Sequence, residues 1–87
     1  MVTEVGGDRH MARLRWRCRR GMLELDLLLQ GFLDQAYTRL SEAERRRFET
    51  LLECADQDLL EWLMGRAVHH DKDIDALIQT IRHTAGA

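Results

Sequence analysis

The residues best equipped for chemistry lie in a short arginine-rich stretch, R-W-R-C-R-R-G-M-L-E-L-D at residues 15–26. Arginine side chains make paired hydrogen bonds with carboxylates and phosphates, so this stretch suits the recognition of a charged partner. Arg20 and Glu24 stand four residues apart across Gly21, and both side chains are expected to point to solvent. Because glycine has no side chain, a partner could approach the backbone there and meet a cation and an acceptor together. The pattern therefore predicts a binding surface.

The same stretch also has a purely local explanation. Arginines at the end of one helix, and Glu24 with Asp26 at the start of the next, would each complement the nearby helix dipole. Gly21 would then make the corner between the two helices. Helix capping and partner recognition both remain open for these residues.

Nucleic-acid binding is the main alternative function for the arginine cluster. Arginines crowd the N-terminal part of the chain and acids crowd the C-terminal part, while the formal net charge is −2, which makes a poor general polyanion binder. Arginines at alternate positions between residues 13 and 19 would spread around a helix, with Trp16 as the only aromatic residue among them. We expect no nucleic acid among the partners, and a small nucleic-acid-binding module stays as an alternative function.

The histidines and acids of H-H-D-K-D-I-D, at residues 69–75, invite comparison with a metal site. If Asp71 is position one of a calcium loop, position six is Ala76 instead of glycine and position twelve is Arg82 instead of glutamate. Acids at a helix start explain the pattern better, because they complement the helix dipole. No nucleophile stands beside a base at a motif spacing, and there is no glycine-rich phosphate loop. The sequence therefore predicts neither a metal site nor catalysis.

The elements that must position these residues are predicted to be helices. The 87 residues contain no proline and are 45% hydrophobic, which favours one small all-α domain. A first helix is expected at residues 11–19, ended by Gly21, whose freedom to adopt a positive φ suits a helix end. A second, central helix has so wide an apolar face, including Leu23 and Leu27, that it is expected to pack on more than one side. Gly31 inside it indicates a close neighbour or a local bend.

Three further helices complete a predicted five-helix bundle. Ser41 and Glu44 form a capping box that starts the third helix, in which the arginines at 45–47 face mainly outward. Asp56 is expected to be the N-cap of a short fourth helix, and Asp71 the N-cap of the last one. The last helix has an apolar stripe at helical spacing, formed by Ile74, Leu77, Ile78 and Ile81.

Residues 1–10 are predicted to be a flexible leader, with the helical domain at residues 11–87. The leader carries acids and no apolar segment, so it is not expected to be a secretory signal, a mitochondrial transit peptide is disfavoured, and a cytoplasmic location is expected. Cys18 and Cys54 stand far apart and outside any C-x-x-C pair, which predicts two reduced, structural thiols.

The two tryptophans are more typical of core or half-buried positions than of partner anchors. Trp62 fits a core position well, because leucines surround it in the sequence. The position of Trp16 is more open, because its sequence neighbours are arginines.

Two motifs together resemble a known family. Residues 20–24, R-G-M-L-E, match an R-G-x-x-E motif, and residues 56–63, D-Q-D-L-L-E-W-L, match a central D-x-D-L-x-x-W-L segment. Both stand in the expected order within residues 12–84. In these features the chain resembles the succinate dehydrogenase assembly factors, also called FAD assembly factors.

The resemblance implies a protein that binds the flavoprotein subunit of succinate dehydrogenase, fumarate reductase or both, and promotes covalent attachment of FAD to it. The chemistry would belong to the client, where a histidine attacks the 8α carbon of bound FAD. This chain would then be a non-catalytic monomer with no tightly bound cofactor and no membrane insertion. Members of the family have also been described as antitoxins, so an antitoxin-type regulatory partner stays as an alternative.

The resemblance also predicts which residues bind the partner. Arg20, Gly21 and Glu24 are the positions that match the R-G-x-x-E motif. Arg13 and Trp16 are added because they lie on the preceding turn.

Overall fold

The computed structural model describes residues 6–86, with side chains described for residues 9–84. In chain order its elements are α1 (Gly6–Arg17), α2 (Leu23–Ala36), the short 3₁₀-helix η1 (Tyr37–Arg39), α3 (Glu42–Leu51), α4 (Asp56–Leu63) and α5 (Lys72–Gly86). The predicted all-α fold with five α-helices is confirmed, and no strand occurs in the described part of the chain. None of the helices within residues 6–86 is long and apolar enough to cross a bilayer.

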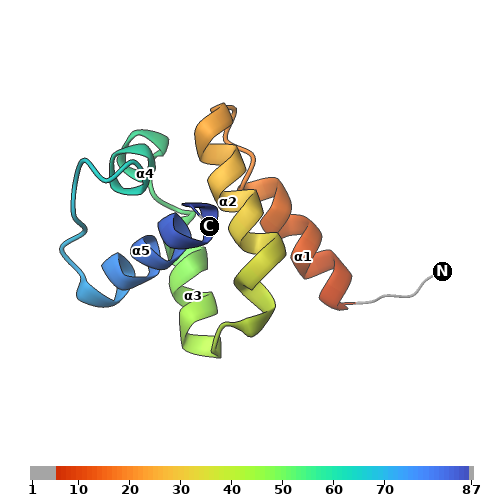
Figure 1. The fold of residues 1–87 in the computed structure, drawn as a ribbon. Helices are drawn as coiled ribbons and strands as arrows, with labels where there is room; N and C mark the ends of the chain where they lie inside the picture. The colour runs from red at the N-terminus through yellow and green to blue at the C-terminus, as the bar shows by residue number, and fades with distance from the viewer. Residues whose placement is uncertain (1–5, 87) are drawn as a thin grey trace.

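The second helix, α2, lies at the centre of the bundle, as predicted. It contacts α1, α4 and α5, and α5 packs in addition on α3 and α4. Figure 1 shows α1 at one edge of the molecule, with α2 between it and α5. One side of α1 and α2 therefore faces away from the other helices, and the arginine-rich stretch connects these two helices.

The core is a single cluster to which every α-helix contributes. The aromatic rings at its centre pack closely, since the Phe32 and Phe48 centroids lie 5.4 Å apart and the Tyr37 and Phe48 centroids 5.8 Å apart. The largest fully buried side chains include Leu14, Leu25, Leu29, Phe32, Leu33, Phe48, Leu51, Leu59, Ile78 and Ile81. A domain of this size has room for only one such core, so the loss of any of these side chains should destabilise the whole fold.

The first helix begins and ends earlier than predicted. It starts at Gly6, inside the stretch predicted as a flexible leader, and it ends at Arg17 instead of residue 19. The part of α1 within the predicted leader contacts the rest of the bundle, because His10 Nε2 lies 3.3 Å from the Tyr37 hydroxyl and 3.3 Å from Glu49 Oε2. Residues 1–5 of the predicted leader lie outside the described residues.

The predicted starts of α3 and α5 are confirmed. At α3 the backbone N–H of Glu44 donates to Ser41 Oγ over 3.1 Å, and the Glu44 carboxylate accepts from the backbone N–H of Ser41 over 2.9 Å. At α5 the carboxylate of Asp71 accepts from the backbone N–H groups of Asp73 and Ile74, over 2.9 and 3.2 Å. Each cap satisfies donors that a helix N-terminus otherwise leaves without a partner.

The prediction that all three arginines of α3 face outward is wrong for Arg45. Its guanidinium lies 5.3 Å from the centroid of the Tyr37 ring and donates to the carbonyls of Tyr37 and Thr38, over 3.3 and 2.9 Å. The end of a helix leaves carbonyls without intrahelical donors, and η1 ends beside Arg45, which supplies them. Arg46 is exposed, as predicted, and Arg47 is half-buried.

Gly31 has no close neighbour that would explain it. A Cβ built at this position meets nothing within 4 Å, and α2 continues through it as regular helix. The expectation of a close approach at Gly31 is therefore wrong.

Replacing Ser41 with alanine should lower the free energy of unfolding by about 1 kcal/mol, because the capping box loses its hydroxyl acceptor. Urea denaturation followed by circular dichroism would measure the change. Thr50→Ala, also an exposed hydroxyl residue on α3, is a matched control expected to change the free energy by less than about 0.5 kcal/mol. Equal stability of Ser41→Ala and the wild type would show that the cap contributes nothing.

Candidate functional site

The corner between α1 and α2 is built around Gly21. Its φ of +83° lies in the left-handed region that favours glycine, as the sequence predicted, and a Cβ there would meet nothing within 4 Å. The Asp26 carboxylate, from the first turn of α2, accepts from the backbone N–H of Arg20 over 2.6 Å and of Gly21 over 3.3 Å. Asp26 thus holds the backbone of the corner, while the space beside Gly21 is open.

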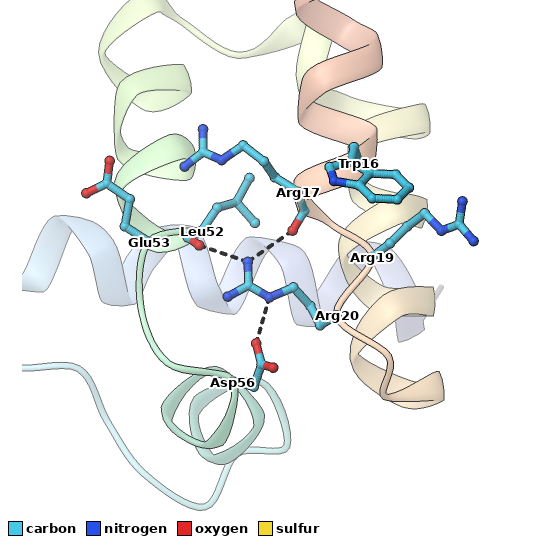
Figure 2. Close-up of a pocket in the computed structure, with 7 residues that line it drawn as sticks. All are labelled: Trp16, Arg17, Arg19, Arg20, Leu52, Glu53 and Asp56. Atoms are coloured by element: carbon cyan, nitrogen blue, oxygen red, sulfur yellow. Dashed lines mark hydrogen bonds and ion pairs between the residues drawn. The ribbon is translucent and has the colours of Figure 1, made fainter.

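Arg20 points into the molecule, and the expectation that its side chain faces solvent is wrong. Only 15% of the side chain is exposed, and its Nε donates to Asp56 Oδ1 over 2.7 Å. Nη1 donates to the carbonyls of Leu52 and Arg17, over 2.8 and 3.0 Å, and Nη2 donates to the carbonyl of Cys54 over 2.9 Å. Figure 2 shows the guanidinium between the end of α1, the end of α3 and the start of α4.

This orientation of Arg20 is explained by carbonyls near the helix ends that lack hydrogen-bond donors. The last carbonyls of a helix have no intrahelical donors, and one guanidinium can supply donors to several of them at once. A charge buried to this extent also requires an anionic partner, which Asp56 provides. Asp56 is therefore not the N-cap of α4 as predicted: Ala55 holds that position without a side-chain cap, and the Asp56 carboxylate bonds Arg20 instead.

The two tryptophans differ in position. Trp62 is half-buried against the core, as predicted, with its ring 4.7 Å from the ring of His69. Trp16 is 70% exposed, so the preference for a core or half-buried position is wrong for this residue. The guanidinium of Arg19 lies over the Trp16 ring, 5.5 Å from its centroid, and Figure 2 shows Arg19 directed away from the inward-pointing Arg20.

Trp16 belongs to an apolar patch on the outer side of α1 and α2. The patch consists of Trp16, Leu23 and Leu27, and the two leucines are 74% and 65% exposed. The prediction that α2 packs on more than one side is confirmed, because this helix contacts α1, α4 and α5. Leu23 and Leu27 do not contribute to that packing, since within the described residues they face solvent. A groove of about 610 Å³ runs along the patch, and it is lined in part by Trp16, Leu23, Leu27, Arg15, Arg19 and Asp26.

The N-terminal arginines do not form one cationic stripe. Arg15 pairs with Asp34 of α2 over 2.6 Å, and Arg17 donates to the backbone carbonyl of Glu49 in α3 over 3.0 Å. These two arginines thus attach α1 to its neighbours. Arg13 is exposed and lines a shallow apolar hollow beside Trp16. This division of the arginines disfavours a nucleic-acid surface, which needs several cations on one face.

Cys18 and Cys54 are both free thiols, in agreement with the sequence prediction. Burial raises the pKa of the Cys18 thiol to about 11, and burial also raises the pKa of Cys54 above its ordinary value. Both thiols are therefore protonated at neutral pH, whereas nucleophilic catalysis requires the thiolate.

Four of the five predicted partner-binding residues are exposed. Arg13 and Trp16 lie on α1, Gly21 forms the corner, and Glu24 lies in the first turn of α2. The fifth, Arg20, connects the corner to the rest of the fold.

Sequence reasoning missed two kinds of residue at this site. Asp26 was assigned only to the helix dipole and Asp56 only to a cap, because nothing in their local sequence indicates a contact with residue 20. Leu23 and Leu27 were recognised as apolar, but helical periodicity does not distinguish a buried face from an exposed one.

Comparisons with known proteins agree on one family. Residues 12–85 match the Sdh5 family model, described as "Flavinator of succinate dehydrogenase". The chain is similar to the "FAD assembly factor SdhE" of Shewanella oneidensis, with 45% identity over 76 residues that cover 87% of this chain and 93% of that protein. It is also similar to the proteins of the same name from Idiomarina loihiensis, with 49% identity over 77% of this chain and 74% of that protein, and from Pseudomonas aeruginosa, with 42% identity over 88% and 92%.

The family match includes both motifs that meet at the Arg20 side chain, since residues 20–24 and residues 56–63 lie within the matched range. The five-helix fold is also the one that the resemblance implied. The chain therefore belongs to the Sdh5 family, the flavinators of succinate dehydrogenase.

Proposed function

We propose that this chain binds the flavoprotein subunit of succinate dehydrogenase and promotes the covalent attachment of FAD to it. Its membership of the flavinator family supports this function. The observation that carries the proposal is the exposed corner of the R-G-x-x-E motif, where Gly21 leaves the backbone open and Glu24 is exposed beside it. A partner can approach this backbone closely, because no side chain covers it.

The proposed contact surface continues from this corner across the apolar patch. An exposed tryptophan beside two exposed leucines is an unusual feature for the surface of a small domain, and such patches mark protein interfaces. Trp16 supplies the large apolar contact area typical of interface anchors, and Arg13 borders it. Glu24 supplies an acceptor for a donor on the client.

The proposed role is that of a binding partner and not of a catalyst. FAD stays on the client, whose own histidine forms the bond to the flavin, and this chain holds no tightly bound cofactor. The protonated thiols of Cys18 and Cys54 support a non-catalytic role, because a thiol nucleophile would have to be a thiolate. To promote attachment and then dissociate, the chain must bind the attachment-ready state of the client more tightly than the finished flavoprotein.

Three finer points belong to the same proposal. The client set includes fumarate reductase as well as succinate dehydrogenase. The chain acts in the cytoplasm, where a reducing environment keeps both cysteines free. It acts as a monomer, because a dimer formed through the apolar patch would cover Trp16 and block the proposed contact surface.

Replacing Glu24 with alanine tests this surface. Because Glu24 is exposed, the free energy of unfolding should fall by only about 0.3 to 1 kcal/mol, from the lost helix-dipole interaction. Binding of the purified flavoprotein subunit should weaken by about 2 to 5 kcal/mol, the usual cost of losing one charged partner at a packed interface. Calorimetric titration would measure binding, and in-gel flavin fluorescence in a host lacking the native gene would measure covalent FAD.

Glu42→Ala is the matched control, since Glu42 is also an exposed acid in the first turn of a helix but lies on α3. It should bind like the wild type. A folded Glu24→Ala protein that binds the subunit normally and restores its covalent FAD would place the contact surface elsewhere. Wild-type protein that neither binds the subunit nor affects its covalent FAD would refute the proposed function itself.

A further inference from the structure

We propose that Asp56 is a positioning residue for the partner-binding corner, and that it acts through Arg20. The inference rests on the proposed function, because it concerns the same surface. In this proposal the inward-pointing Arg20 side chain maintains the conformation of the corner. The Asp56 carboxylate, 36 residues further along the chain, acts on the partner-binding corner through this side chain.

The Arg20 guanidinium is fixed in one orientation by groups on several of its sides. Asp56 Oδ1 accepts from Nε over 2.7 Å, and three backbone carbonyls accept from the two terminal nitrogens. Among these acceptors, Asp56 is the only one that carries a charge. The carboxylate therefore supplies the electrostatic part of the attraction that keeps the arginine turned inward.

The backbone of the same residue is held by a second carboxylate. Asp26 accepts from the N–H groups of Arg20 and Gly21, over 2.6 and 3.3 Å. Residue 20 is thus held twice, by Asp56 through its side chain and by Asp26 through its backbone. Gly21 follows directly, and its φ of +83° is the torsion that turns the chain into α2. A change in the position of residue 20 must therefore shift the exposed backbone of Gly21.

Asp56 is partly exposed and does not belong to the buried core, so its substitution can affect the corner while the core stays packed. Its side chain is 43% exposed and lines a hollow of about 600 Å³, which is also lined by Trp16, Arg19 and Arg20 (Figure 2). Because water screens the exposed Asp56 carboxylate, this ion pair contributes less to global stability than a fully buried pair would. Loss of the Asp56 charge would let the Arg20 guanidinium turn into this hollow, towards Trp16, while the core stays packed.

The competing possibility is that Arg20 releases Asp56 on docking and contacts the client itself. The two possibilities predict opposite effects of neutralising Asp56. If Asp56 positions the corner, its neutralisation weakens client binding. If Asp56 only holds Arg20 back, neutralisation leaves binding unchanged or strengthens it.

The test compares Asp56→Asn with Asp58→Asn, a matched control because Asp58 also lies in the first turn of α4 but forms no hydrogen bond or ion pair with Arg20 among the described residues. Asp56→Asn should shift the backbone amide signal of Gly21 in the nuclear magnetic resonance spectrum of the free chain. It should also weaken binding of the flavoprotein subunit on the order of tenfold. Asp58→Asn should change neither quantity, and Asp56→Glu, which keeps the charge, should recover part of the lost affinity.

A double-variant comparison separates positioning from general destabilisation. If Asp56 acts through Arg20, the variant carrying both Arg20→Gln and Asp56→Asn should bind no more weakly than Arg20→Gln alone. Additive losses would overturn the inference, as would wild-type or tighter binding by Asp56→Asn. The Gly21 amide signal is measured without the client, so an unshifted signal in Asp56→Asn overturns the inference alone, whereas the absence of binding by the wild type refutes the proposed function.

Discussion

Replacing Arg20 with alanine should lower the free energy of unfolding by about 2 to 4 kcal/mol, a large loss for a domain of this size. The alanine variant leaves the carbonyls of Leu52, Cys54 and Arg17 without the donors that the guanidinium supplies. It also leaves the Asp56 carboxylate unpaired, although partial exposure of this carboxylate limits that part of the loss. This loss follows from the inward orientation of Arg20, whereas the sequence predicts a side chain that faces solvent.

The neighbouring residue provides the control. Arg19 precedes Arg20 directly, but its side chain is exposed and lies over Trp16, so Arg19→Ala should change the free energy of unfolding by less than about 0.5 kcal/mol. Urea denaturation of the two variants, followed by circular dichroism, would measure both changes. Similar midpoints for Arg20→Ala and Arg19→Ala would contradict the inward contacts of Arg20.

Features specified by nearby residues could be predicted from the sequence. The capping box of Ser41 and Glu44, the cap at Asp71 and the positive φ of Gly21 each depend on a few consecutive residues. The five helices could be predicted for a similar reason, because apolar residues at helical spacing mark each buried face. The resemblance to the family predicts which residues of the corner bind the partner, but it does not predict the direction in which their side chains point.

Features that depend on distant contacts could not be predicted in the same way. The Arg20–Asp56 pair joins residues 36 positions apart, and the local rules assigned one to a solvent-facing site and the other to a cap. Arg45 was misplaced for the same reason, since its acceptors lie on η1. Tertiary contacts outweigh local preference at such positions, because a buried guanidinium gains more from several acceptors than from exposure on a helix surface.

The apolar patch shows a second kind of feature that could not be predicted from the sequence, namely which apolar face stays exposed. Leu23 and Leu27 are as apolar as the buried leucines of α2, so composition alone assigns them to a packed face. Whether the same chain or another protein covers such a face depends on where the neighbouring helices lie. The position of α1 at the edge of the bundle leaves this face open (Figure 1).

Replacing Gly21 with arginine should weaken binding of the flavoprotein subunit about 100-fold or more. The new side chain starts in open space, because a Cβ at Gly21 meets nothing within 4 Å. The same open space is where the client is proposed to approach the backbone, so the added side chain would occupy the contact itself. The measurement is a titration of the purified subunit at a temperature where the variant is folded.

Two further substitutions at Gly21 separate the causes of this loss. Any non-glycine residue at a φ of +83° is strained by about 1 to 2 kcal/mol, so Gly21→Ala and Gly21→Arg should destabilise the free fold similarly. Gly21→Ala adds little bulk and should retain most of the affinity. Gly21→Gln carries a long side chain without a charge, and it should lose nearly as much affinity as Gly21→Arg if bulk is the cause.

The relative affinities of these three variants for the flavoprotein subunit show whether binding depends on open space at Gly21 or on its positive φ. Retained binding by Gly21→Ala with loss in both long-chain variants would mean that the client needs open space above the corner. Equal loss in all three variants would mean that it needs the φ that glycine permits, since strain is what they share. Normal affinity of Gly21→Arg would contradict both possibilities, because no protein could dock closely on a backbone covered by that side chain. The corner would then be a helix connection alone, and the client would have to bind through another face of the bundle.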